Sequence, residues 1–171
     1  MQRALSHSIM SHISGLRSPY AKVGRLVYFG RMLDKIRLHA AGKLPPEYVS
    51  NLGESHGANM FDARCCRFLG VKHAELAAQA LARGSGAAPA DDESLLAWAH
   101  ARGTPRTDEE CNIWNQFMAK RGWRDEALAF MRADMAEFGA ALAGKKIETY
   151  FDYLDADEGH DPAAERLWEK I

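Results

Sequence analysis

Cysteine is scarce in this sequence, and long uncharged runs are absent. There are three cysteines, an odd number, and Cys65 and Cys66 are adjacent. This argues against a disulfide scaffold and predicts reduced thiols in a cytoplasmic protein. No run approaches the roughly 20 apolar residues that a membrane-spanning helix needs. Residues 1–15 hold one basic residue and no apolar block, unlike a secretory signal. We therefore expect a cytoplasmic protein without a membrane partner.

The composition is that of an ordinary globular domain. Apolar residues make up 47% of the chain and charged residues 26%, which excludes a disordered protein. A chain of 171 residues fits one domain. It can bury roughly 70% of its unfolded surface. We expect a single domain over residues 1–171, with residues 1–15 as a mobile N-terminal extension.

The net charge of −1 hides an asymmetry along the chain. Residues 1–45 carry eight basic residues and one acid, a charge of +7 that leaves −8 for the remainder. The densest acidic stretch, residues 151–162, has five acids and no Lys or Arg. Either the two ends meet in the fold and neutralise each other, or each faces a different partner.

Apolar residues at steps of three and four predict helices throughout the chain. No segment alternates as a strand does, and only residues 24–29 are β-rich enough to question. Thr107 and Glu110 have the spacing of a capping box at the start of one helix. Ser18-Pro19 predicts the start of another. We expect an all-α fold, a compact orthogonal bundle of about seven short helices.

Two stretches carry further structural expectations. Residues 43–58 contain two prolines and two glycines, a composition typical of a loop. Asp125 is expected to open a long helix, whose apolar face includes Met131 and Met135, and which ends at Gly144.

Four strings of the sequence, taken in order, resemble a known family. They are Leu16-Arg17-Ser18-Pro19; Arg31-Met32-Leu33-Asp34-Lys35-x-Arg37 with Gly42-Lys43; Thr107-x-x-Glu110-x-x-x-Trp114-Asn115; and Phe151-Asp152-Tyr153-x-Asp155-Ala156-Asp157-Glu158-Gly159. Together they resemble a bacterial family of small proteins catalogued only as a domain of unknown function, from about residue 16 to residue 160. The resemblance implies an intracellular protein and no particular activity. Residues 44–61 differ from the family pattern, with Tyr48 and Phe61-Asp62 as counterparts on either side of an insertion.

Charged side chains cluster on the helix that is expected to end at Gly42. Arg31, Lys35 and Arg37 could form an anion-binding face, because guanidinium groups give paired hydrogen bonds to phosphate or carboxylate. The alternative is a solvated helix face with one Asp34–Arg37 ion pair at a spacing of three residues, worth only tenths of a kcal/mol.

The candidate ligand-binding residues combine this helix with residues from the other family-like segments. They are Arg31, Asp34, Lys35, Arg37, Asp62, Trp114, Asn115 and Asp152. Trp114 lies on an apolar stripe, so core packing is the first interpretation for it. Asn115 is either an exposed amide or a group that orients a ligand in a pocket.

The acidic stretch also suggests a divalent-cation site. Asp155, Asp157 and Glu158 supply hard oxygen ligands at short spacing. An EF-hand loop is excluded, since counting from Asp155 puts His160 where that loop requires glycine. The alternatives are frayed helix-end acids and ion pairs with the basic N-terminal part. No cofactor follows from the sequence beyond this possible cation.

Three functions from different classes remain open. The first is binding of an anionic or zwitterionic small molecule between the basic helix and the acidic C-terminal segment. The second is a protein-interaction or structural domain without a small ligand. The third is an enzyme that uses these carboxylates or a metal, although no complete catalytic constellation can be assembled. No helix-turn-helix or base-stacking motif is recognisable, so nucleic acid is not an expected partner.

Overall fold

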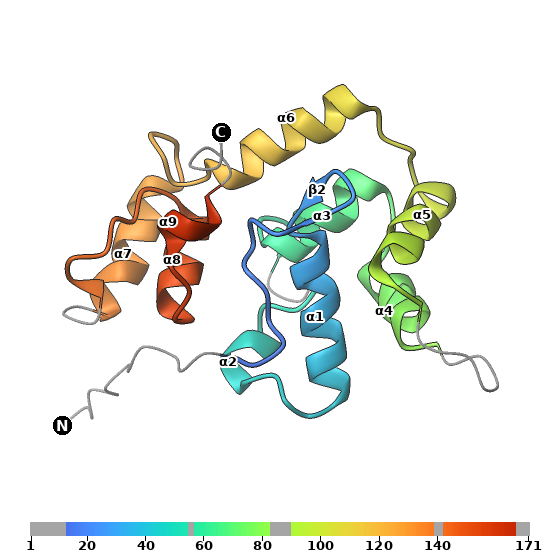
Figure 1. Ribbon diagram of the computed structural model, residues 1–171, viewed down its shortest axis with the longest axis horizontal. Helices are drawn as coiled ribbons and strands as arrows, with labels where there is room; N and C mark the ends of the chain where they lie inside the picture. Colours follow the sequence, from blue (N-terminus) through green and yellow to red (C-terminus); the bar gives the residue numbers. More distant parts are fainter. Residues whose placement is uncertain (1–12, 55–56, 83–89, 139–141, 167–171) are drawn as a thin grey trace. The chain divides into compact units, whose positions relative to one another are not determined.

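A computed structural model of the protein describes residues 13–54, 57–82, 90–138 and 142–166 (Figure 1). The chain divides into two compact units. The N-terminal unit consists of Gly15–Arg17 and Ala21–Asn115, and the C-terminal unit of Met1–Ser14, Ser18–Tyr20 and Gln116–Ile171. Residues 1–12, most of the expected mobile extension, lie outside the described residues. The single-domain expectation stays a prediction.

The all-α fold class is confirmed. Within the described residues the chain forms nine helices and one hairpin of two very short strands. The elements of the N-terminal unit are β1 (Lys22–Val23), β2 (Leu26–Val27), α1 (Phe29–Ala40), α2 (Pro46–Val49), α3 (Phe61–Leu69), α4 (His73–Leu81) and α5 (Asp92–Arg102). The division between the units falls inside α6 (Asp108–Ala119), and α7 (Leu128–Phe138), α8 (Tyr150–Asp157) and α9 (Pro162–Glu165) follow. No helix in these described ranges is long and apolar enough to cross a membrane.

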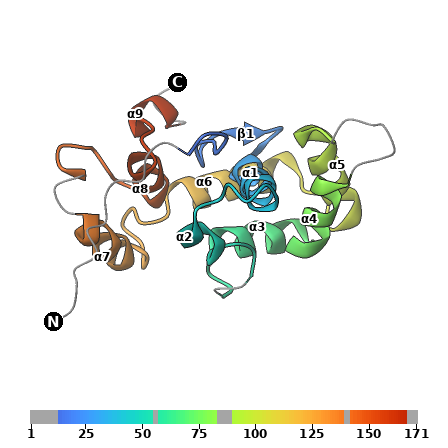
Figure 2. The ribbon, with the colours of Figure 1, turned by 90° about the horizontal axis from the view of Figure 1, so that it is seen from below.

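The core of the N-terminal unit forms around α1. Phe29, Met32 and Leu33 are fully buried, and so are Leu76 of α4 and Leu95 of α5. Helix α1 contacts β1, α4 and α5, and Figure 2 shows the hairpin on one side of α1 and α3 and α4 on the other. The apolar spacing that predicted this helix therefore corresponds to the face that is buried.

The C-terminal unit packs α7 against α8. Phe151 and Ala156 of α8 and Met131 of α7 are buried. The ring of Tyr20 meets Phe151 edge to face, with centroids 5.1 Å apart, an arrangement that aromatic pairs favour. Tyr20 is far from this helix in sequence, so the segment Ser18–Tyr20 is an integral part of the C-terminal unit.

The predicted helix start at Ser18-Pro19 is wrong. The Ser18 hydroxyl accepts a hydrogen bond from the Tyr20 amide at 3.2 Å, which closes a local turn instead of capping a helix. The hairpin follows, with Val23 opposite Leu26. Its second strand lies within residues 24–29, the one stretch whose composition was rich enough in β-forming residues to question a helix. Gly24 has a φ of +52°, which suits the two-residue connection between the strands.

Two other local expectations need correction. Residues 43–58 are not entirely loop, because α2 forms a four-residue helix within them. Helix α7 begins at Leu128, not at Asp125. The capping box of Thr107 and Glu110 is confirmed: the Glu110 amide donates to the Thr107 hydroxyl at 3.2 Å, and the Thr107 amide to the Glu110 carboxylate at 2.9 Å.

Candidate functional site

The turn between α6 and α7 is organised by one carboxylate. Oδ1 of Asp125 accepts hydrogen bonds from the amides of Gly122 at 3.0 Å and Ala127 at 2.9 Å. Its Oδ2 lies 2.8 Å from a guanidinium nitrogen of Arg121. Asp125 was expected to open the helix, but through these three contacts its side chain instead organises the turn that precedes α7. They hold the residue between them, Arg124, at a φ of +55°.

Arg124 is conformationally unusual. Within the described ranges, Arg124 and Tyr28 are the two non-glycine residues with a positive φ. That conformation costs about 1–3 kcal/mol and persists only where the surrounding contacts impose it. Such residues are enriched at binding and catalytic sites, and Arg124 borders a pocket.

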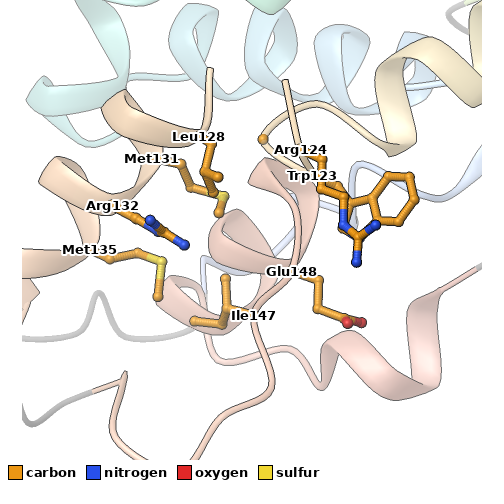
Figure 3. A pocket seen from close by; sticks show the side chains of 9 residues that line it. Trp123, Arg124, Leu128, Met131, Arg132, Met135, Ile147 and Glu148 are labelled. Carbon is orange, nitrogen blue, oxygen red and sulfur yellow. The ribbon is translucent and has the colours of Figure 1, made fainter. Parts of the chain in front are cut away.

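The pocket has a volume of about 250 Å³ and lies wholly within the C-terminal unit (Figure 3). The turn after α6, helix α7 and the segment before α8 enclose it. Its lining residues are Gly122, Trp123, Arg124, Leu128, Met131, Arg132, Met135, Ile147 and Glu148. Four of these are aliphatic or thioether side chains, three are charged and one is an indole, so the pocket combines an apolar floor with a charged rim.

The glycine at the base of the turn suits both its backbone conformation and its crowded position. Gly122 has a φ of +89°, and a Cβ on it would lie 2.7 Å from Sδ of Met131 and 3.3 Å from the Tyr150 amide. Glycine adopts this φ without strain, whereas a Cβ here would require Met131 to shift. The close approach forms one wall of the pocket.

The two arginines of the pocket have no acidic partner among the residues that the structure describes. The guanidinium of Arg124 lies 5.1 Å from the centroid of the Trp123 ring, a cation–π contact. Arg132 extends from α7 toward the hollow in Figure 3. The third charged group, Glu148, has its Oε2 3.4 Å from Nζ of Lys146 and 3.6 Å from a guanidinium nitrogen of Arg166.

Two of the residues proposed from the sequence, Lys35 and Asp62, meet in the N-terminal unit. Nζ of Lys35 lies 2.6 Å from Oδ1 of Asp62, and both side chains are buried. The same carboxylate accepts hydrogen bonds from the Tyr28 hydroxyl at 2.8 Å and the Gly53 amide at 2.9 Å. Nε2 of His73 lies 4.0 Å from Oδ2 of Asp62 and has no hydrogen-bond partner within the described part of the chain.

Burial changes the proton affinities of this cluster. It raises the pKa of the Tyr28 phenol well above its ordinary value, and the nearby Asp62 adds to the shift. It lowers the pKa of His73, although Asp62 opposes the effect. At neutral pH the cluster therefore contains an intact phenol and a neutral imidazole beside the Lys35–Asp62 ion pair.

Asp34 and Arg37 do not pair with each other, which corrects the predicted i,i+3 contact. Arg17 forms two hydrogen bonds of 2.7 Å to the Asp34 carboxylate, and Asp92 accepts one of 2.7 Å from Arg37. Asp92 also lies 2.7 Å from Arg17. The four side chains thus alternate in charge. Arg17 and Asp34 form a bidentate pair, a geometry stronger than a single contact along the helix, and Arg37 instead bonds to Asp92 and the Ala90 carbonyl.

Three more candidate residues have contacts that explain them within the N-terminal unit. Arg31 is buried and donates to the Arg17 carbonyl at 3.0 Å. Trp114 stacks on Phe68 with centroids 4.6 Å apart. Asn115 accepts from the Val27 amide at 3.0 Å and donates to the Arg25 carbonyl at 2.7 Å, so its amide fastens the hairpin to α6.

Asp152 lies at the centre of a buried network in the C-terminal unit. Its carboxylate accepts hydrogen bonds from the Tyr20 hydroxyl at 2.8 Å and from Arg166 at 2.9 and 2.8 Å. The amides of Glu148 and Thr149 donate to it at 2.8 and 3.1 Å, and Thr149 and Asp152 form the capping box of α8. Asp152 and Arg166 are both fully buried. The sequence did not indicate Arg166 or Tyr20 as partners, because neither has a regular spacing from Asp152.

The acidic residues proposed as metal ligands are all buried. Asp155, Asp157 and Glu158 are 0%, 7% and 1% exposed, and the Ser18 hydroxyl donates to Asp155 at 2.8 Å. In the described part of the chain, no three His, Cys, Asp or Glu side chains gather into a group that could hold a metal ion. The cation site stays a prediction.

The pocket residues were missed by the sequence analysis. Met131 and Met135 were assigned to the apolar face of α7, while Trp123, Arg124 and Arg132 carried no recognisable pattern. The sequence does contain one pattern that could have pointed to the pocket. Trp123 and Arg124 directly follow Gly122, and an indole beside a cation is suited to ligand binding.

Comparison with known proteins gives one match. Residues 13–160 are similar to a family described as Domain of unknown function (DUF5069), which agrees with the resemblance carried by the four strings. No curated protein and no solved structure matches the chain. The matched range contains the pocket and Asp152, and it ends before Arg166.

Proposed function

We propose that this chain, which belongs to the family described as Domain of unknown function (DUF5069), binds a small organic anion in the pocket beside α7. One observation carries the proposal: Arg124 and Arg132 border an apolar pocket, and neither has an acidic partner among the described residues. A guanidinium can hold a carboxylate or a phosphate through two parallel hydrogen bonds. The remaining lining suits an apolar body attached to that group.

The size of the pocket supports a small ligand. A cavity of about 150 Å³ accommodates benzene, and this pocket measures about 250 Å³. The thioethers of Met131 and Met135 can adjust to ligands of different shape. The turn contacts of Asp125 hold the backbone of Arg124 in place, so less backbone ordering is needed on binding.

The cations of α1 are a weaker candidate for anion binding. Lys35 is buried against Asp62, and Arg37 is bonded to Asp92. A ligand there would have to compete with these internal carboxylates. Arg124 and Arg132 are exposed and have no ion pair among the described residues, so an incoming anion has no internal carboxylate to displace from them.

Cytoplasmic localisation is part of the proposal. Cys65, Cys66 and Cys111 are free and buried, as is common where thiols are kept reduced. Burial raises the pKa of the Cys66 thiol to about 12, so the unreactive protonated form prevails at neutral pH.

Isothermal titration calorimetry with 4-methylpentanoate, at low salt and pH 7.5, tests the proposal. The neutral isostere 4-methylpentanamide should bind at least tenfold more weakly, and Arg132→Gln should weaken binding of the acid by a similar factor. Lys120→Gln is the matched control, because it removes an exposed cation from the same unit outside the pocket. Equal binding of acid and amide, or an equal effect of the two variants, would contradict the proposed function.

A further inference from the structure

We infer that the pocket ligand is a zwitterion: an α-amino acid with an apolar side chain, whose carboxylate binds Arg132 and whose ammonium group binds Glu148. The inference rests on the proposed function and specifies the ligand class for the same pocket. It follows from the one acidic residue of the lining, Glu148.

The Glu148 carboxylate retains capacity for a ligand. Its two ionic contacts, 3.4 Å to Lys146 and 3.6 Å to Arg166, are both made by Oε2, and both exceed the usual N–H···O distance. Oε1 has no contact among the described residues. The side chain is 39% exposed, so an ammonium group can reach it, and –NH₃⁺ offers three donors to such an acceptor.

Backbone contacts fix the position of residue 148 at the pocket rim. The Glu148 amide donates to Oδ2 of Asp152 at 2.8 Å, and the adjacent Thr149 caps α8. The backbone of Glu148 is therefore held at the pocket rim by a buried network, and its side chain extends from there. In Figure 3, Arg132 comes from α7 on one side of the pocket, and Glu148 comes from the opposite side, next to Ile147.

This charge arrangement favours a ligand with both signs. A simple organic acid can bind Arg132 but offers no donor to Oε1 of Glu148, the oxygen that makes neither of the two ionic contacts. An α-amino acid places an ammonium group there instead. Its side chain would then lie against the apolar floor formed by Leu128, Met131 and Met135. A polar side chain there would lose its hydration without gaining hydrogen bonds, which costs free energy.

Calorimetric titration of the full chain compares three probes with the same branched side chain. They are leucine, N-acetyl-leucine, which has lost the ammonium charge, and 4-methylpentanoate, which has lost the amino group. We expect leucine to bind at least tenfold more tightly than either of the others. This comparison needs no variant protein, so it stands even where a substitution impairs folding.

Two substitutions assign the contacts. Glu148→Gln should abolish the advantage of leucine over 4-methylpentanoate, and Arg132→Gln should weaken both. Glu137→Gln is the matched control, because it removes an exposed acid of the same unit that does not line the pocket.

The outcomes separate the two proposals. If 4-methylpentanoate binds as tightly as leucine, or if Glu148→Gln leaves the preference unchanged, the zwitterion inference is overturned while anion binding stands. If no probe gives a binding isotherm, the proposed function fails as well.

Discussion

Removal of the cation from the buried Asp152 network should destabilise the C-terminal unit strongly. Arg166→Met keeps a long apolar stem but removes the guanidinium, which is fully buried and bonded to Asp152 through two nitrogens. Breaking a buried pair on one side costs about 3–5 kcal/mol. Asp152 retains its bonds from Tyr20 and from two amides, so we expect the lower end, about 3 kcal/mol.

Urea denaturation followed by circular dichroism measures this loss, and thermal melting checks it. For a chain of this length, about 3 kcal/mol corresponds to a fall in Tm of roughly 6–12 °C. The reciprocal variant Asp152→Asn should cost a similar amount. In the double variant the two losses should not add, because each substitution has already broken the same pair.

Additive losses would show that Arg166 and Asp152 stabilise the protein independently. A loss below about 1 kcal/mol for Arg166→Met, the range of an exposed ion pair, would mean that water reaches the carboxylate in solution. Either result would refute the role assigned to this network. Lys120→Gln provides the baseline for removing an exposed cation that forms no ion pair with the described residues.

Three further predictions concern other parts of the fold. Because burial lowers the pKa of His73 from 6.5, the unfolded chain takes up the proton first. Stability should therefore fall as the pH drops below about 6.5; urea titrations at pH 7.5 and 5.5 should show a smaller fall for His73→Gln, and an identical fall would exclude His73 as its source. Asp62→Asn leaves Lys35 buried without its counter-ion and should cost about 3 kcal/mol in the same assay; a neutral result would contradict the pairing. Gly122→Ala, at a φ of +89°, should cost about 1 kcal/mol or more and weaken 4-methylpentanoate binding in calorimetry; unchanged stability and affinity would contradict the role of this glycine.

Helices were predictable from the sequence because their signals are local. The apolar spacing of α1 and the capping box before α6 involve residues within a few positions of each other. The hairpin was not predictable with the same certainty, since strands of two residues are too short to show alternation. Ser18-Pro19 had the composition of a helix start, but the Ser18 hydroxyl bonds to the Tyr20 amide instead.

The candidate site was less predictable, because its contacts are long-range. Asp34 and Arg37 look like partners on one helix, yet each bonds to a residue that the fold brings from elsewhere. Arg132 looks like an ordinary exposed cation of α7. Only the approach of the turn at Gly122 and of the segment before α8 makes it part of a pocket.

Arg166 determines where a fragment of this chain can be ended. The stretch shared with the family ends at residue 160, but the counter-ion of Asp152 lies six positions later. A fragment ended at the limit of detectable similarity would bury an acid without its cation, and such a fragment should express as an insoluble or protease-sensitive product. A fragment of this chain intended to fold should therefore extend beyond residue 160 to include Arg166.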